Sequence, residues 1–112
     1  MVWNSVRSTD DVDSIIVASY HTPQILFKHS TRCFLSSMVK NRFEDEWAYT
    51  EKEFTAHFLD IFSFRKVSNY VAERLSVHHE SPQLIMIHKG ETIFDTSHHD
   101  IYAEELRTII LN

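Results

Sequence analysis

Cys33 is the only cysteine among the 112 residues, and its neighbours are of the types that thiol chemistry uses. Arg32 brings a positive charge next to it, and Ser36 brings a hydroxyl three residues later. The thiolate is the nucleophilic form of cysteine, and a nearby cation or hydrogen-bond donor favours it. The spacing Cys-x-x-Ser places Ser36 where a dithiol redox protein has its second cysteine. These residues therefore indicate exchange chemistry with a single thiol.

The surrounding pattern places Cys33 where a strand ends and a helix begins. Residues 24–28 are short, apolar and bounded by breakers, which is typical of a buried strand. A polar connection, 29–32, follows. A helical stripe then runs over Leu35, Met38, Val39, Phe43 and Trp47. A helix N-terminus has unpaired N–H groups and a partial positive charge, and both favour a thiolate. A lone cysteine is also often inert and buried, so the residues alone leave both interpretations of Cys33 open.

The rest of the chain alternates between extended and helical patterns. Apolar helical faces span 12–20, 33–47, 67–75 and 102–110, and strands are predicted at 2–6, 24–28, 57–62, 83–88 and 91–95. The last two strands form a hairpin, with the only glycine, Gly90, in its turn. The order is β-α-β-α-β-α-β-β-α. It predicts one α/β domain over residues 1–112, with a mixed sheet and helices on both faces.

Composition narrows the function classes. The formal net charge is −5, which disfavours binding to nucleic acid through its phosphates. No stretch approaches the roughly 20 apolar residues needed to span a membrane, and the N-terminus lacks a secretion-signal pattern. One cysteine excludes an intramolecular disulfide. Because a lone thiol is most easily kept reduced in the cytoplasm, we expect a cytoplasmic protein.

A second feature is the dipeptide Ser81-Pro82, just before the predicted strand 83–88. A proline at this position can simply mark where the strand starts. In the predicted topology, however, it lies at the same end of the sheet as the helix of Cys33. A cis bond there would place a fixed surface beside the thiol, and the sequence leaves the isomer open.

Eight histidines raise the question of a metal site. The pairs His78-His79 and His98-His99 each offer at most one ligand to a given site, because adjacent side chains on a strand point to opposite faces. No cysteine or acidic cluster completes a metal-ligand spacing, so we predict no metal. His29 can approach Cys33 as a base, but a hydrogen-bonding role at the strand end is the favoured interpretation.

Two segments carry a resemblance to a known family. The stretches "ILFKHSTRC..SSM...RFE" (25–44) and "VHHESPQLIMIHKGE" (77–91) are similar to the bacillithiol-system YtxJ family, the monothiol bacilliredoxins of the thioredoxin-like superfamily. The segment "SHHDI" (97–101) also resembles that family. The resemblance spans nearly the whole chain, and it implies a thioredoxin-like fold.

The resemblance implies a bacterial, cytoplasmic thiol–disulfide oxidoreductase that removes bacillithiol from protein mixed disulfides. Cys33 matches the active cysteine, and Ser81 and Pro82 match the cis-proline pair that contacts the client. Ser36 and Arg32 are expected to stabilise the thiolate. No bound cofactor is expected, since bacillithiol acts as a co-substrate, and the expected partners are bacillithiolated client proteins and a low-molecular-weight thiol.

One position departs from the family pattern. Many members have proline directly after the active cysteine, whereas this chain has Phe34. Phe34 lacks the preorganised helix start that proline provides, and it puts an aromatic surface beside the thiol, where we expect it to contact the substrate. Two other functions stay open: a non-catalytic adaptor that binds clients through Phe34, and a single-cysteine redox sensor.

Overall fold

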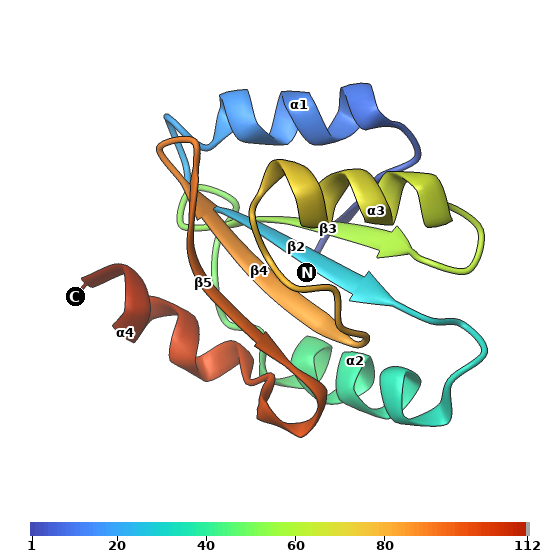
Figure 1. The fold of residues 1–112 in the computed structure, drawn as a ribbon. Coiled ribbons are helices and arrows are strands. Elements are labelled where there is room, and N and C mark those ends of the chain that lie inside the picture. Colours follow the sequence, from blue (N-terminus) through green and yellow to red (C-terminus); the bar gives the residue numbers. More distant parts are fainter. Residues whose placement is uncertain (112) are drawn as a thin grey trace.

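The computed structural model describes residues 1–111 (Figure 1). The strands are β1 (Trp3–Ser5), β2 (Gln24–His29), β3 (Thr55–Asp60), β4 (Gln83–His88) and β5 (Glu91–Ser97). The helices are α1 (Thr9–Ala18), α2 (Phe34–Glu46), α3 (Arg65–Arg74) and α4 (Leu106–Leu111), and two 3-10 turns, His98–Asp100 and Ala103–Glu105, precede α4. The predicted order β-α-β-α-β-α-β-β-α is confirmed.

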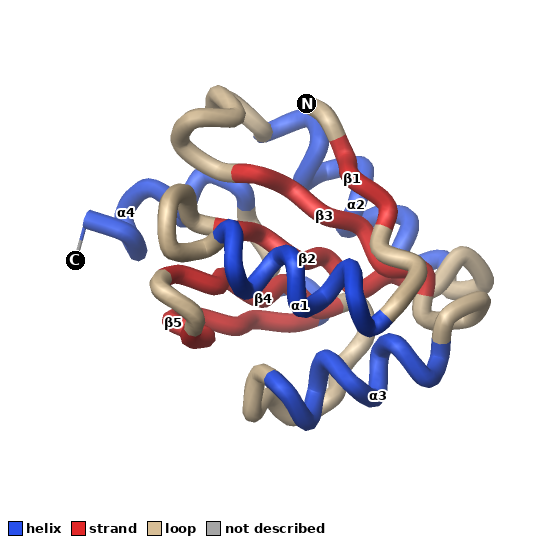
Figure 2. Tube along the Cα trace, turned by 90° about the horizontal axis from the view of Figure 1, so that it is seen from above, coloured by secondary structure: helices blue, strands red, loops and turns tan. Residues whose placement is uncertain are grey.

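The five strands form one mixed sheet in the order β1-β3-β2-β4-β5 (Figure 2). β3 pairs in parallel with β1 and β2, and β4 pairs antiparallel with β2 and β5. The long crossovers through helices permit the parallel pairs, and the tight turn enforces the antiparallel pairing of β4 with β5. β4 is also antiparallel to β2 although it follows α3, so a helix between strands did not by itself imply parallel pairing here. In that turn Lys89 and Gly90 both have positive φ, of 51° and 82°, as a two-residue hairpin turn requires.

Helices cover both faces of the sheet, with α1 and α3 on one side and α2 and α4 on the other (Figure 1). Alternate residues of the central strand β2 serve the two cores, because successive side chains on a strand point to opposite faces. Leu26 lies in the core under α1 and α3, whereas Ile25 and Phe27 lie in the core under α2 and α4. All six residues of β2 are buried.

Several predicted boundaries were wrong. The strand predicted at 57–62 is β3, which ends at Asp60 and leaves Phe62 exposed in the following turn. Met38 is 49% exposed, although the helical stripe predicted it to be in the core. Tyr20 lies beyond the end of α1, exposed against the turn glycine. Trp47 follows α2 yet still packs on the core beneath it. The packing of neighbouring elements decides which residues of an apolar stripe become buried. The periodicity of the stripe alone does not show this.

The C-terminal helix of the structure is shorter than the apolar pattern that predicted it. The pattern begins at Tyr102, but the first turn is a 3-10 turn and α4 begins at Leu106. Ser97 precedes the other 3-10 turn without a side-chain cap.

Within the described residues, no helix combines the length and apolar character needed to cross a membrane.

Candidate active site

Cys33 occupies the position that the sequence predicted, at the N-cap of α2. Its backbone is extended (φ −111°, ψ 120°), and its side chain is half-buried. The main chain is held at both groups: Cys33 N–H donates to Ser30 O (3.1 Å), and Cys33 O accepts from Ser37 N–H (3.1 Å). The first turn of α2 has no acidic residue and no side-chain cap. The positive end of the helix is therefore free to interact with the sulfur.

Ser36 is fully buried, and its hydroxyl is engaged away from the thiol. Its Oγ lies 2.6 Å from His29 Nδ1 and accepts from Ser30 N–H at 3.1 Å. Among residues 1–111, no hydrogen bond joins this hydroxyl to the sulfur of Cys33. The expected role of Ser36 as a thiolate stabiliser stays a prediction, while its bonds to the loop before Cys33 are structural facts.

His29 is the last residue of β2, and it is buried on the α2 face of the sheet. The hydrogen-bonding role predicted for it is confirmed by its contact with Ser36. Burial lowers the pKa of His29, the Lys40 charge lowers it further, and the Asp60 and Glu44 carboxylates oppose these effects. The lowered pKa favours the neutral imidazole. A neutral ring in a buried site needs hydrogen-bond partners but no counter-ion.

Arg32 and Phe34 flank the thiol on the exposed side. The Arg32 guanidinium stacks on the ring of Phe62, with its central carbon 4.2 Å from the ring centroid. Phe34 is the first residue of α2 and is 81% exposed. Phe62 is 54% exposed, and sequence reasoning missed it because it was assigned to a strand. The thiol thus lies beside exposed aromatic surface, and the thiolate-stabilising role of Arg32 and the substrate contact of Phe34 stay predictions.

Ser81 and Pro82 lie at the same end of the sheet as the loop that leads to Cys33. The Ser81-Pro82 peptide bond is cis. β4 pairs antiparallel with β2, with Gln83 opposite Lys28, so Pro82 lies beside the end of β2 (Figure 1). Neither main-chain group of Ser81 has a hydrogen-bond partner within the described part of the chain. The structure therefore brings these two residues and the Cys33 loop to the same end of the sheet, as the topology predicted.

Lys28 is a functional candidate that sequence reasoning missed. It lies next to the last residue of the central strand β2, with no exposed surface and on the face opposite to His29. Its Nζ donates to Ser68 O (3.1 Å) on α3 and lies 3.2 Å from His79 Nδ1. Burial lowers the pKa of Lys28 to about 8. The lysine inside the run "QILFKH" was the available signal, since a charge in a buried strand needs a partner.

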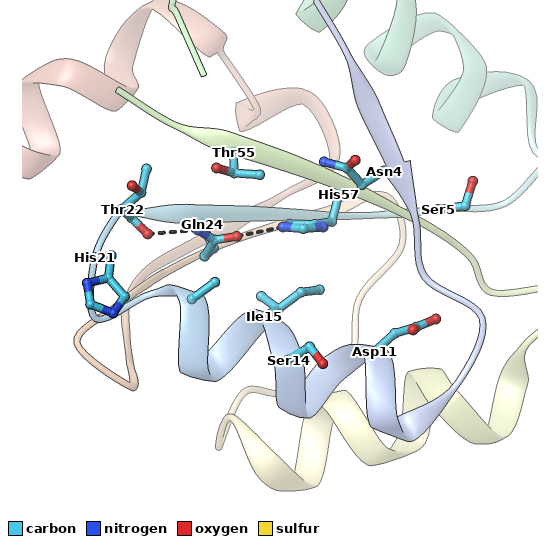
Figure 3. A pocket seen from close by; sticks show the side chains of 11 residues that line it. Asn4, Ser5, Asp11, Ser14, Ile15, His21, Thr22, Gln24, Thr55 and His57 are labelled. Atoms are coloured by element: carbon cyan, nitrogen blue, oxygen red, sulfur yellow. Dashed lines mark hydrogen bonds between the residues drawn. The ribbon is translucent and has the colours of Figure 1, made fainter. Parts of the chain in front are cut away.

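A hollow of about 550 Å³ lies away from the thiol, between α1 and the start of the sheet (Figure 3). At its wall the His57 ring nitrogen Nε2 lies 2.6 Å from Gln24 Oε1, and Gln24 Nε2 donates to Thr22 O at 2.8 Å. Burial lowers the pKa of His57 to about 4, so the ring is neutral. These bonds pair the side chains of His57 and Gln24, and none of the residues that line the hollow belongs to the Cys33 loop.

The histidine pairs do not gather into a metal site. His78 Nε2 and His98 Nε2 lie 3.8 Å and 3.3 Å from the two oxygens of Glu80. Among residues 1–111, no group of three or more histidine, cysteine or acidic side chains is placed to hold a metal ion. His78 and His98 thus contact Glu80, next to the Ser81-Pro82 segment, while His79 contacts Lys28.

Solved structures of other proteins share the fold of this chain. Among solved structures, one described as having a thioredoxin fold shares 26% identity, covers 97% of this chain and 94% of its own, and superposes with a TM-score of 0.82. Thioredoxin from Malassezia sympodialis (14% identity, 98% and 89% coverage, TM-score 0.74) and thioredoxin from Fasciola hepatica (14%, 96% and 96%, 0.71) share the fold.

The family match is more specific than the fold. Residues 4–106 match the model of the family described as monothiol bacilliredoxin BrxC. This range contains the single cysteine and the cis-proline segment, and the resemblance inferred from the two sequence segments is thereby confirmed. The chain is a thiol redox protein with a thioredoxin fold, and it belongs to the monothiol bacilliredoxin BrxC family.

Proposed function

We propose that the protein removes bacillithiol, or a similar low-molecular-weight thiol, from mixed disulfides on client proteins in the bacterial cytoplasm. The observation that carries the proposal is the single thiol, half-buried at the N-cap of α2, in a chain of the monothiol bacilliredoxin family. One thiol suffices to accept the small thiol from a client, whereas internal disulfide formation would need a second cysteine.

The exchange proceeds in two balanced steps. In the first, the Cys33 thiolate attacks the bacillithiol sulfur of the mixed disulfide, that S–S bond breaks, and the client leaves as a thiolate that takes a proton from water. Cys33 then carries bacillithiol in a new disulfide. In the second, another low-molecular-weight thiolate attacks the bacillithiol sulfur of that adduct. This restores the Cys33 thiolate and forms the disulfide of the two small thiols.

The surroundings of Cys33 have defined tasks in this proposal. The N-terminus of α2, which has no side-chain cap and no acidic residue in its first turn, would interact with the negative charge of the thiolate. The exposed Arg32 guanidinium is available to the carboxylates of the bacillithiol malate group. The unpaired main-chain groups of Ser81 bind the client backbone next to its disulfide, and Phe34 adds apolar contact.

Intact-mass spectrometry of single-turnover reactions tests the proposal. A bacillithiolated client is mixed with the reduced wild-type protein and, separately, with Cys33→Ala. Wild type is expected to free the client and to gain the mass of one bacillithiol, while Cys33→Ala does neither. Equal release by both proteins would show that the thiol is not the reagent.

A parallel arm with a glutathionylated client tests which small thiol is the co-substrate. Faster release from the bacillithiol disulfide supports the assignment to bacillithiol. An equal or faster release from the glutathione disulfide would contradict it, while leaving thiol exchange through Cys33 intact.

The exposure of Phe34 and Phe62 also favours a second function, a client-binding adaptor without turnover. Large exposed aromatic side chains are a common feature of protein-binding surfaces. An adaptor would bind the client equally well with Cys33→Ala and would gain no bacillithiol mass. The same mass-spectrometric reactions, combined with a binding assay, therefore separate the adaptor from the exchange protein.

A further inference from the structure

Lys28 is a buried cation with no opposite charge beside it. It has no exposed surface, and its strand neighbours Phe27 and Leu26 belong to the two apolar cores. Its ammonium contacts a main-chain oxygen, Ser68 O, and the imidazole of His79, and no carboxylate of residues 1–111 lies within ion-pair distance. A buried charge without a counter-ion is unfavourable to folding, so packing alone does not account for a lysine here.

The two contacts of Lys28 join three separate parts of the fold. Lys28 lies in β2, which leads into the Cys33 loop, Ser68 lies in α3, and His79 lies in the segment 76–82 between α3 and β4. Figure 1 shows this segment in gold, running across the sheet from the end of α3 to the start of β4 beside the tip of β2. It ends in Ser81 and the cis proline, at the end of the sheet where β2 leads into the Cys33 loop.

The side chain of His79 links this segment to β2 and α3, while Val77 packs on the core below. His79 is an exposed residue, yet its Nδ1 lies 3.2 Å from the Lys28 ammonium and 3.4 Å from Ser68 Oγ. The neighbouring groups Arg65, Glu80 and His78 also carry or can carry charge, and they act on His79 only through space. The segment is also held by Gln83, which binds His78 O and Glu80 N–H, and by two main-chain bonds, from Val77 N–H to Ala72 O and from His98 N–H to Pro82 O.

We propose that Lys28 is a positioning residue for thiol–disulfide exchange. Its buried ammonium holds His79, and this contact fixes the position of the Ser81-Pro82 main chain, which binds the client next to the disulfide that Cys33 attacks. The proposal rests on the function proposed above. Lys28 does not touch the sulfur or the substrate, because it lies on the opposite face of the sheet from α2. Its effect is therefore expected on client exchange and not on the intrinsic reactivity of the thiol.

The decisive variant is Lys28→Met, which keeps most of the side-chain volume and removes the donors. Two rates are compared with wild type: alkylation of Cys33 by iodoacetamide, which needs no docking, and kcat/KM for a bacillithiolated client. We expect alkylation to stay within about twofold and kcat/KM to fall at least tenfold, chiefly through a higher KM. A tenfold change corresponds to about 1.4 kcal/mol of lost interaction.

Stability separates positioning from a merely structural role. Replacing a buried charge by an apolar side chain of similar size is often neutral or stabilising, so the urea midpoint of Lys28→Met is expected to be unchanged or higher. The rate of client exchange is then expected to fall while the urea midpoint stays the same or rises. The exposed Lys66→Met, on α3, changes net charge equally and is the matched control, expected to behave as wild type.

His79→Gln provides a second variant that does not depend on the core. It is expected to lose client exchange to a similar degree, and Lys28→Met combined with His79→Gln is expected to lose little more, since the two residues act as a unit. Amide hydrogen exchange gives a readout independent of activity. Exchange in segment 77–81 is expected to accelerate in both single variants.

Four results would overturn the proposal. These are client exchange by Lys28→Met within twofold of wild type, equal losses of alkylation and client exchange, a comparable loss in Lys66→Met, or unchanged hydrogen exchange in segment 77–81. A failure of the underlying function looks different, because then wild type itself releases the client no faster than Cys33→Ala.

Discussion

Two adjacent residues at the end of β2, Lys28 and His29, show how differently the two faces of one sheet handle a buried polar side chain. His29 lies on the α2 face and is neutral, and one short bond to Ser36 satisfies its Nδ1. Lys28 lies on the α3 face and carries a charge that two neutral partners share. A neutral ring can be buried with a single partner, whereas an ammonium remains poorly solvated even with two.

The difference indicates what each face contributes. On the α2 face, the bond between His29 and Ser36 ties the Cys33 loop to its helix over seven residues of chain. On the α3 face, Lys28 reaches His79 across 51 residues. The first contact shapes the thiol loop, and the second holds the segment that faces it.

The largest expected contrast lies in the response of stability to alkaline pH. Burial lowers the pKa of Lys28 from 10.5 to about 8. Between these values the unfolded chain binds more protons than the folded one, so the free energy of unfolding of wild type rises with pH relative to Lys28→Met. Between pH values of about 7.5 and about 10, urea denaturation is expected to show wild type gaining on the order of 3 kcal/mol of unfolding free energy relative to Lys28→Met. Parallel pH curves would mean that Lys28 is solvated in the folded state.

Ser36→Ala tests the other side of the comparison. Removing the hydroxyl leaves His29 Nδ1 and Ser30 N–H without their partner in a buried site, at a cost of about 2 kcal/mol of unfolding free energy. Ser37→Ala, one residue along the same helix, is the matched control and is expected to cost less than about 0.5 kcal/mol. Similar midpoints for the two variants in thermal denaturation would argue against this bond as a structural link.

His57 extends the comparison to a partly buried polar side chain. Burial lowers the pKa of His57 from 6.5 to about 4, so the unfolded chain binds more protons between these values, and stability is lost as pH falls through this range. We expect His57→Gln to reduce the acid loss between pH values of about 7 and 4 by roughly 1–2 kcal/mol. His99→Gln, at an exposed site, is the control, and an equal change in both variants would contradict the prediction.

The smallest expected effect concerns the exposed side of the thiol. Phe34 is the first residue of α2, where proline is preorganised, and its side chain has little packing to lose. Phe34→Pro is expected to raise the unfolding free energy by about 0.5 kcal/mol, because it restricts the unfolded chain. Differential scanning calorimetry measures the change, with Phe34→Ala as a control. A lower midpoint for Phe34→Pro would show that the helix start depends on the aromatic ring.

Local patterns predicted the element order, the turn at Lys89-Gly90 and the N-cap position of Cys33, because each depends on residues that are neighbours in the chain. They failed at Met38, which lies on the apolar stripe of α2 but is exposed, and at the bounds of β3. A stripe shows which residues can be covered, while the packing of the rest of the molecule decides which ones are.

The sequence by itself therefore determined that one thiol opens a helix after a buried strand, and the similarity of its segments to a known family indicated the chemistry. Only the tertiary structure decided the partners of the polar residues around that thiol. Ser36 turns to His29, Arg32 stacks on Phe62, and Lys28 reaches His79 from the far face of the sheet. The reason is physical: a buried polar group must find a partner wherever folding places it, and the partner of Lys28 is remote in the chain, as is the ring on which the exposed Arg32 stacks.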